Sequence, residues 1–130
     1  MILDSSAVVA VALREPGADR VLAAMSAAPA LGIGAPTLVE TTLVLSARLG
    51  RDARGLVSRF VLEADVAVVP FTDAHFGTAL DAWLRYGRGR HPAGLNFGDC
   101  LAYATARVAG EPLLFTGTDF SRTDIAPAAT

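Results

Sequence analysis

The chain has 130 residues, of which 52% are hydrophobic, so it is long and apolar enough to build one folded domain with a core. The formal net charge of −2 gives no overall nucleic-acid footprint, so any site for a polyanion has to be local. All 11 basic residues are arginine. The absence of lysine excludes P-loop, Schiff-base and kinase-type ATP chemistry, and argues against receiver-type and haloacid-dehalogenase-type phosphotransfer, because these sites rely on a lysine.

The cysteine content and the N-terminus indicate a cellular compartment. Cys100 is the only cysteine, so an internal disulfide framework is impossible, which fits a reducing environment. The apolar N-terminal segment is too short to span a bilayer, is interrupted by Asp4 and has no basic flank, so neither a signal peptide nor a membrane anchor is expected. The sequence therefore favours a cytoplasmic protein.

The first half of the chain alternates short apolar runs with helical patterns. Asp4 ends the first apolar run, and Ser5 or Ser6 is expected to cap the helix that follows. Pro36 opens a later helix and Gly50 closes it. In chain order, the elements expected here are a strand over 1–3, helices over 7–15 and 18–28, a strand over 30–35, and helices over 37–49 and 52–64.

The second half continues the alternation. Thr72 or Asp73 is expected to cap one helix, and Gly110 to end another. Because the strands are short, continuous apolar runs separated by helices, we expect a single α/β domain over 1–130, with a parallel sheet covered by helices on both faces. The elements expected here are a strand over 66–71, a helix over 74–87, a loop over 88–95, a helix over 96–108, a strand over 112–116, a turn over 117–120, and a short edge strand over 124–126 before a fraying tail.

Four acidic residues fall where predicted strands end or where the next helices begin. Asp4 directly ends the first strand, and Asp119 lies in the turn beyond the strand over 112–116. Glu40 and Asp99 each lie in the first turn of a predicted helix. In open α/β sheets, ligand sites lie outside the carboxyl ends of the strands. The sequence therefore predicts that these four side chains meet at one edge of the sheet.

Each acid taken alone also has a plain structural explanation. Asp4 can cap a helix, and Glu40 can interact favourably with the positive end of a helix dipole. Asp99 can complete a capping box that Asn96 begins, and Asp119 can be an ordinary turn residue. We nevertheless expect the faces around the two helical acids to be apolar and to point inward, on the basis of Leu43, Val44 and Ala47 beside one acid and Ala102, Tyr103 and Ala106 beside the other.

Four carboxylates in one place predict a metal site. They would repel each other, and some would take up protons unless a cation joined them. Oxygen ligands without histidine or cysteine at ligand spacing suit Mg²⁺ or Mn²⁺ rather than zinc. Such an ion activates water and neutralises a phosphate during in-line attack. The residues therefore predict hydrolysis of phosphodiester bonds, with Asp99 meeting the metal directly or through water.

Four segments of the chain resemble the PIN-domain ribonucleases, and specifically the VapC-type toxins of toxin–antitoxin pairs. The resemblance covers nearly the whole chain, and its most specific part is the long segment that leads to Asp99. The segments are "MILDSSA", "PTLVETTLVLSARLG", "YGRGRHPAGLNFGDCLAYATA" and "PLLFTGTDFSRTDI".

The resemblance implies a catalytic site, a fold and partners. The implied metal ligands are Asp4, Asp99 and Asp119, with Glu40 as a further ligand or a base that acts on water. The implied fold is a five-stranded parallel sheet, and the implied activity is that of an Mg²⁺- or Mn²⁺-dependent endoribonuclease, for which transfer RNA is a plausible target. A homodimer and inhibition by a VapB-type antitoxin are also implied. Ser6 and Thr116 match polar positions that support the site in the family.

The loop over 85–91 is rich in basic side chains near the predicted acidic site. Because acids repel RNA, a basic rim would help to grip phosphates, and arginine suits bidentate phosphate contacts. The alternative is a solvated loop without a partner. The candidate RNA-binding residues are Arg85, Arg88, Arg90 and His91.

Two apolar helical segments, 7–13 and 38–47, can present surface to a partner, because the mean hydropathy of +0.44 is high for so small a chain.

The sequence leaves two rival functions open. The first is a metal-dependent DNA nuclease or phosphatase that uses the same acids. The second is a catalytically silent protein-binding module whose acids grip a basic segment.

Overall fold

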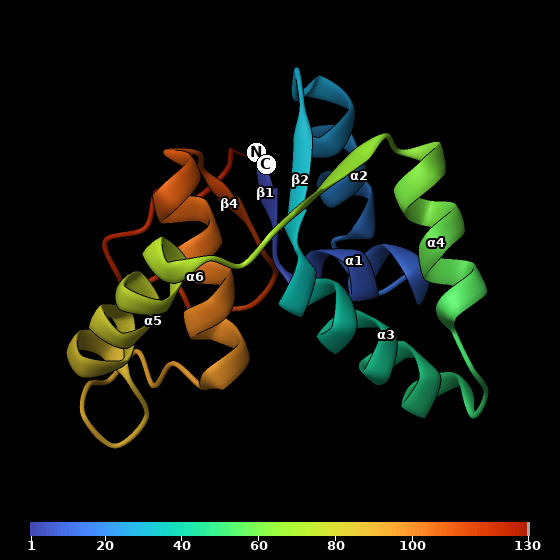
Figure 1. Cartoon of the computed structure of the whole chain (residues 1–130). Helices are drawn as coiled ribbons and strands as arrows, with labels where there is room; N and C mark the ends of the chain where they lie inside the picture. The colour runs from blue at the N-terminus through green and yellow to red at the C-terminus, as the bar shows by residue number, and fades with distance from the viewer. Residues whose placement is uncertain (130) are drawn as a thin grey trace.

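The computed structural model describes residues 1–129, which form an α/β fold with helices on both faces of a parallel sheet (Figure 1). The predicted fold class is therefore confirmed, and most predicted elements lie within a few residues of their expected positions. The elements are β1 (Ile2–Leu3), α1 (Ser5–Ala12), α2 (Ala18–Ala27), β2 (Leu31–Gly34), α3 (Ala35–Leu49), α4 (Arg54–Glu63), β3 (Val66–Val69), α5 (Asp73–Tyr86), α6 (Phe97–Ala109) and β4 (Leu113–Leu114).

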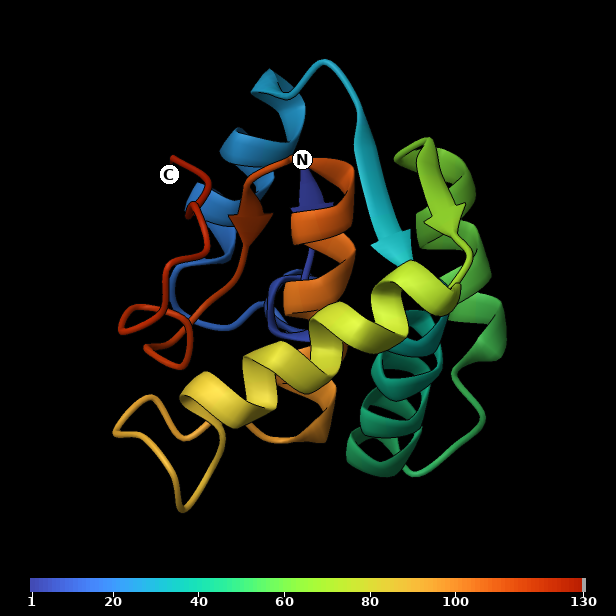
Figure 2. The ribbon, with the colours of Figure 1, turned by 60° about the vertical axis from the view of Figure 1, so that its left-hand side comes forward.

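The sheet has the strand order β3-β2-β1-β4, and all its pairings are parallel. The chain moves outward from β1 to β3 and then returns to place β4 on the other side of β1. Neighbouring residues of each strand point to opposite faces, so Ile2 and Leu113 pack with α5 and α6, whereas Leu3 and Leu114 pack with α1 and α2. Figure 2 shows α5 and α6 crossing in front of the sheet.

The expected fifth strand is wrong, because the described residues form a sheet of four strands. The C-terminal segment does reach β4, but it forms only one isolated bridge, between Leu113 and Pro127. The backbone N–H groups of Leu113 and Ala128 each donate a hydrogen bond of 2.9 Å across this bridge. The Pro127 nitrogen takes no part in these two hydrogen bonds, and among the described residues the pairing does not extend into a strand. The fraying tail expected from the sequence includes Thr130, which lies outside the described residues.

The first helix begins earlier than expected. The sequence favours Ser5 or Ser6 as the cap of a helix over 7–15, but Asp4 is the N-cap and the helix ends at Ala12. Both the backbone N–H and the hydroxyl of Ser6 donate to Asp4 Oδ2, at 3.1 and 2.6 Å. The short loop after β1 therefore fixes the carboxylate at the end of that strand.

The helix expected over 37–49 begins two residues earlier, at Ala35, so Glu40 lies beyond the first turn of α3 and the expectation that placed it in that turn is wrong. The other boundaries of α3 and α5 lie where their residues predict. α3 starts with Pro36 in its first turn and ends at Gly50, whose φ of +67° is the left-handed conformation that glycine adopts easily. Thr72 caps α5 with His75, which is buried, so this histidine has a structural role.

Among residues 1–129, no helix combines the length and the apolar character that crossing a membrane requires.

Candidate active site

The carboxyl ends of β1 and β4 lie side by side at the point where the strand order reverses, which is where parallel sheets bind ligands. Asp4 follows β1 directly, and its N–H donates to the carbonyl of Leu114 at 2.9 Å. Thr116, just after β4, donates its backbone N–H to Ser6 Oγ at 3.0 Å. Ser6 therefore ties the two strand ends together while it also holds Asp4, and both predicted supporting residues lie at the site.

Within the described chain, Asp4 is a buried carboxylic acid without a cation beside it. Asp4 is only 4% exposed to solvent. Burial raises the pKa of Asp4, the Ser6 hydrogen bonds oppose this shift, and the nearby charge of Glu40 raises the pKa further. None of the described salt bridges includes Asp4. A positive charge from outside the chain would therefore relieve an unfavourable arrangement.

Asp99 sits at the start of α6 and has two roles to reconcile. It completes a capping box, because Asn96 N–H donates to Asp99 Oδ2 at 3.0 Å and Asp99 N–H donates to Asn96 Oδ1 at 2.9 Å. The simple structural explanation is therefore correct as far as it goes. Burial, with help from the charges of Asp119 and Asp4, nevertheless raises the pKa of Asp99 to about 6. A cap alone needs no cluster of acids around it.

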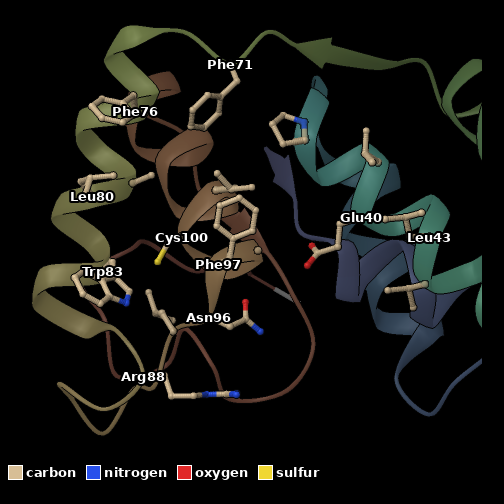
Figure 3. Close-up of a pocket in the computed structure, with 17 residues that line it drawn as sticks. Glu40, Leu43, Phe71, Phe76, Leu80, Trp83, Arg88, Asn96, Phe97 and Cys100 are labelled. Atoms are coloured by element: carbon tan, nitrogen blue, oxygen red, sulfur yellow. The ribbon is translucent and has the colours of Figure 1, made fainter.

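Glu40 reaches the same place from α3. A Cβ built on Gly98 would overlap the Glu40 carboxylate, so this carboxylate lies directly against the first turn of α6. Figure 3 shows Glu40 pointing from α3 towards that turn. Gly98 therefore leaves the space in which the Glu40 carboxylate sits, and the sequence offered only a glycine beside an aspartate as a signal for it.

The fourth acid, Asp119, is exposed in the turn after β4. It lies near enough for its charge to act on Asp99. The four acids thus approach each other pairwise, as Asp4 with Glu40, Asp99 with Asp119, and Asp99 with Asp4. Within residues 1–129, however, no three histidine, cysteine or acidic side chains already lie in an arrangement that could hold a metal ion. A metal would need side chains such as that of exposed Asp119 to move inward.

The donor set suits a hard divalent cation. All four acids supply carboxylate oxygens, and both histidines have other roles, since His75 caps α5 and His91 Nδ1 accepts a hydrogen bond from Ala93. Asp4, which is buried, and Asp99, which is half-buried, form no salt bridge within the described residues and would gain most from such a cation. The residues present therefore fit Mg²⁺ or Mn²⁺ better than zinc.

Of the four predicted RNA-binding residues, Arg88 lies nearest to the acids. It is exposed, and its charge acts on Asp99 and lowers the pKa of that carboxyl against the larger effect of burial. Arg85 instead pairs with Asp124 at 3.3 Å. Arg90 lies over the ring of Trp83, 4.8 Å from its centroid, and donates to the Leu84 carbonyl.

His91 packs edge-on against Tyr86, with ring centroids 5.2 Å apart. This contact and the Arg90 contacts fasten the 88–95 loop to α5, and the hydrogen bond from Ala93 to His91 holds the loop internally. The loop is therefore tied down rather than merely solvated. The basic rim is thus divided between Arg88, which faces the acids, and residues that hold structure together.

An apolar groove of about 1020 Å³ begins beside the acids and runs between α3 and α5 (Figure 3). Our expectation that the face of α3 around Glu40 points into the core is wrong, because Leu43 is 66% exposed and lines this groove. The core-facing side of α3 carries Thr37, Thr41 and Leu45 instead. The corresponding expectation for α6 is confirmed. The apolar groove is lined mainly by Val39, Leu43, Phe76, Leu80, Trp83 and Phe97.

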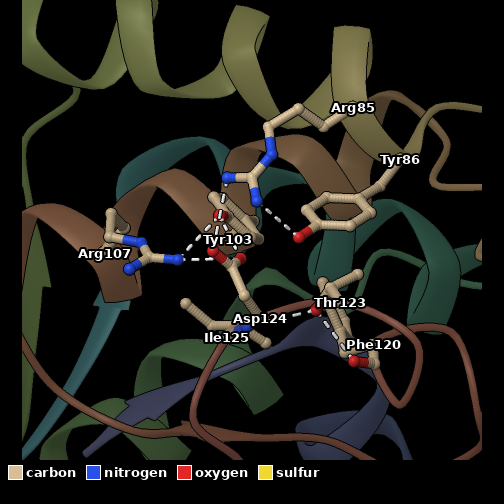
Figure 4. A network of polar contacts seen from close by, with 8 residues as sticks. All are labelled: Arg85, Tyr86, Tyr103, Arg107, Phe120, Thr123, Asp124 and Ile125. Atoms are coloured by element: carbon tan, nitrogen blue, oxygen red, sulfur yellow. Dashed lines mark hydrogen bonds and ion pairs between the residues drawn. The ribbon is translucent and has the colours of Figure 1, made fainter.

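A polar cluster centred on Asp124 was not predicted from the sequence. Tyr103 donates its hydroxyl to Asp124 Oδ1 at 2.6 Å, and Arg107 and Arg85 pair with the same carboxylate (Figure 4). We call these four residues the tail clasp, because they fasten the C-terminal segment to α5 and α6. A tyrosine and an arginine one helical turn apart, Tyr103 and Arg107, were the only signal in the sequence.

The family model described as "PIN domain" matches residues 1–126. Ribonuclease VapC36 of Mycobacterium tuberculosis is 47% identical over 126 residues, which cover 96% of this chain and 91% of that protein. Ribonuclease VapC30 of the same species is 40% identical over 129 residues, covering 99% of this chain and 98% of the relative. A ribonuclease VapC of Mycolicibacterium smegmatis is 39% identical over 126 residues, covering 97% and 98%.

Two solved structures share the fold. The crystal structure of Mycobacterium tuberculosis VapC20, described as a sarcin-ricin loop cleaving toxin, matches with a TM-score of 0.77 at 24% identity and covers 99% of this chain and 98% of that one. A toxin–antitoxin complex from Klebsiella pneumoniae matches with a TM-score of 0.69 at 17% identity, covering 95% and 92%. At these identities the two likenesses establish the fold.

Proposed function

Since this chain belongs to the PIN-domain family and is a ribonuclease of the VapC type, we propose that it cleaves RNA with a divalent cation held by Asp4, Glu40, Asp99 and Asp119. The family as a whole depends on divalent metals; the choice of Mg²⁺ or Mn²⁺ and of these four residues is our proposal. A bound ion would supply a Lewis acid that activates water and offsets the charge of the phosphate. The proposed setting is the toxin of a toxin–antitoxin pair acting in the cytoplasm.

The chain's own residues divide the work. Asp4, fixed by two Ser6 hydrogen bonds, provides an oriented ligand at the end of β1. Asp99, at the start of α6, and Asp119, in the turn after β4, would supply carboxylate ligands from two further segments. The Glu40 carboxylate, which lies against Gly98, is placed to accept a proton from water or to hold the cation. Thr116 acts indirectly, because it holds Ser6.

The observation that supports this function most strongly is the pair of acids Asp4 and Asp99. Burial is the main cause that raises the pKa of each, and the negative charges of neighbouring acids raise it further. Neither carboxylate forms a salt bridge within residues 1–129. A buried carboxylate without a cationic partner is costly to the fold. Carboxylates without cationic partners at the carboxyl end of a parallel sheet are what a site for a metal ion requires.

A digestion panel tests the proposed activity. The purified chain is incubated with structured RNA, single-stranded DNA of the same sequence and a small phosphate ester, with Mg²⁺, with Mn²⁺, or with a chelator. We expect cleavage of RNA only, and only with a metal. Equal cleavage of DNA or hydrolysis of the ester would favour the nuclease or phosphatase alternative. No turnover of any substrate would favour a silent binding module.

The apolar groove supports a second proposal, namely that the antitoxin docks there. VapC toxins pair with antitoxins, and the groove exposes large apolar side chains such as Leu43, Phe76 at 64% and Phe97 at 80%. Because Glu40 and Arg88 line the same groove, a segment seated in it would cover the entrance to the acids. Leu43→Glu is therefore expected to remove antitoxin binding and leave the RNA cleavage of the free chain unchanged.

We also propose that the free chain is a homodimer, which the resemblance to the family implies. α1 no longer supports this idea, because Val8 and Val9 are buried in the described structure. The exposed side of α3 and α5, which lines the apolar groove, offers apolar surface for such a contact. Light scattering of the purified chain without antitoxin tests the proposal, and a monomer at micromolar concentration would contradict it.

A further inference from the structure

A small polar hollow lies beside Asp119 and shares no lining residue with the apolar groove. It has a volume of about 430 Å³ and is formed by two segments far apart in the sequence, the loop that carries Pro92 and Ala93 and the turn after β4. The turn contributes Thr118, Asp119, Ser121 and Arg122. Asp119 belongs to both places, since it lines the hollow and its charge acts on Asp99. The hollow therefore opens onto the proposed catalytic site.

Among the described residues that line the hollow, Arg122 alone has a cationic side chain. Within residues 1–129 it is exposed and forms no salt bridge, whereas Arg85 and Arg107 are both held by Asp124. A guanidinium in this position is free to meet an anion, and its planar fork suits two oxygens of one phosphate. Asp119 would repel that phosphate, so Arg122 supplies the compensating charge in the same hollow.

The walls of the hollow are fixed before any ligand arrives. Ser121 donates its hydroxyl to the Thr118 carbonyl at 2.6 Å and its backbone N–H to the same carbonyl at 3.1 Å. Ala93 donates its N–H to His91 Nδ1 at 3.0 Å, which holds the opposite wall. The described lining contains no aromatic ring, so it offers no platform on which a base could stack. Its chemistry suits the sugar–phosphate backbone.

We propose that this hollow binds a backbone phosphate next to the scissile one, with Arg122 as the residue that grips it. The inference rests on the proposed ribonuclease function and adds a substrate-binding residue to it. Arg88 lines the apolar groove and Arg122 lines the hollow, and each place contains a residue whose charge acts on Asp99, so the two arginines belong to separate surfaces beside the acids. The RNA strand crosses the acids between them, and the apolar groove stays available to a protein.

The test measures RNA binding separately from cleavage. Arg122→Gln is made in the Asp99→Asn background, and the dissociation constant for a short single-stranded RNA is measured between about 50 and 200 mM salt. We expect about tenfold weaker binding and a salt-dependence slope smaller by about one, because one phosphate contact is lost. The matched control is Arg51→Gln, since Arg51 is exposed beyond the end of α3 and also forms no salt bridge in the described residues.

In the otherwise unaltered chain, Arg122→Gln is expected to raise KM about tenfold and to leave kcat within about twofold, because the contact is made equally in the ground state and the transition state. Arg122→Lys should recover part of the loss. Binding and slope equal to those of the Arg51→Gln control would overturn the inference, and so would a loss confined to kcat. Failure of the unaltered chain to cut any RNA would instead count against the proposed function.

Discussion

The acidic edge of the sheet, formed by Asp4, Glu40, Asp99 and Asp119, differs from the tail clasp in how its charge is balanced. In the clasp, burial alone would raise the pKa of Asp124, but hydrogen bonds from Tyr103 and Arg107 and the charges of Arg107 and Arg85 outweigh it and lower the pKa to about 2. At the acidic edge, burial raises the pKa values of Asp4 and Asp99, and other acids add to the effect.

This difference in cationic partners distinguishes a carboxylate that stabilises the fold from carboxylates that are available to bind a ligand. Asp124 has its cations built into the chain, and removing it should harm the structure and spare the chemistry. Asp4 and Asp99 have no such partners in the described residues, so removing either should harm the chemistry and spare the structure.

The largest effect is expected for Asp99→Asn. Cleavage of RNA should fall about a thousandfold, because a neutral amide is a poor ligand for a hard cation. An asparagine side chain can still accept the Asn96 hydrogen bond, so the capping box and the fold should remain. Initial rates and circular dichroism check both parts. Asp81→Asn, which alters an exposed acid of α5, is the control and should cut at the normal rate. Near-normal cleavage by Asp99→Asn would remove Asp99 from the site.

Gly98→Ala should lower activity about tenfold and hardly change stability. The new methyl group would occupy the space of the Glu40 carboxylate, and that flexible side chain would swing away. The stabilising effect of alanine in a helix offsets part of the crowding, so the melting temperature should stay within about 3 °C. Gly77→Ala, in α5 with open space around it, is the control and should keep full activity. An active Gly98→Ala chain would show that Glu40 is not needed where it lies.

Asp4→Asn and Asp124→Asn should shift stability in opposite directions when metal is absent. The Asp4→Asn change keeps a side-chain oxygen for the cap but removes a buried charge, so the free energy of unfolding should rise by about 1 kcal/mol. Asp124→Asn should lower it by about 1 kcal/mol or less, since the carboxylate is 40% exposed and solvent screens its ion pairs. Urea unfolding at neutral pH with a chelator measures both. Shifts of the same sign would contradict the contrast.

The smallest effect is the pH dependence of the tail clasp. The folded-state pKa of Asp124, about 2, lies below the value of about 3.9 for an unfolded aspartate. Its stabilisation is therefore complete above about pH 4 and is lost as the pH falls towards about 2. The stability difference between the wild type and Asp124→Asn should shrink when urea unfolding is repeated at about pH 5, 4 and 3. A difference that grows in acid would show that Asp124 is not held by its cations.

Sequence alone predicted the elements of this fold well, because periodicity and turn residues are local signals. It also placed Asp4 and Asp119 directly after two strands, β1 and β4, which the topology sets side by side. It failed where the answer depends on which surface stays uncovered. Leu43 reads as a core residue but lines the apolar groove, and Asp124 reads as solvated but closes the tail clasp. Similarly, an arginine count could not show that Arg85 and Arg90 are occupied while Arg88 and Arg122 form no salt bridge in the described residues.

Calorimetric titration with Mn²⁺ is the most direct test of whether the acidic edge holds a divalent cation. The wild type and Asp124→Asn should bind the ion alike, and their melting temperatures should rise as it is added, because a ligand that binds only the folded state stabilises it. Asp4→Asn and Asp99→Asn should show neither heat of binding nor a rise in melting temperature. If the wild-type chain binds neither Mn²⁺ nor Mg²⁺, the acidic edge is not a metal site. If Asp99→Asn binds them as the wild type does, Asp99 is not a ligand.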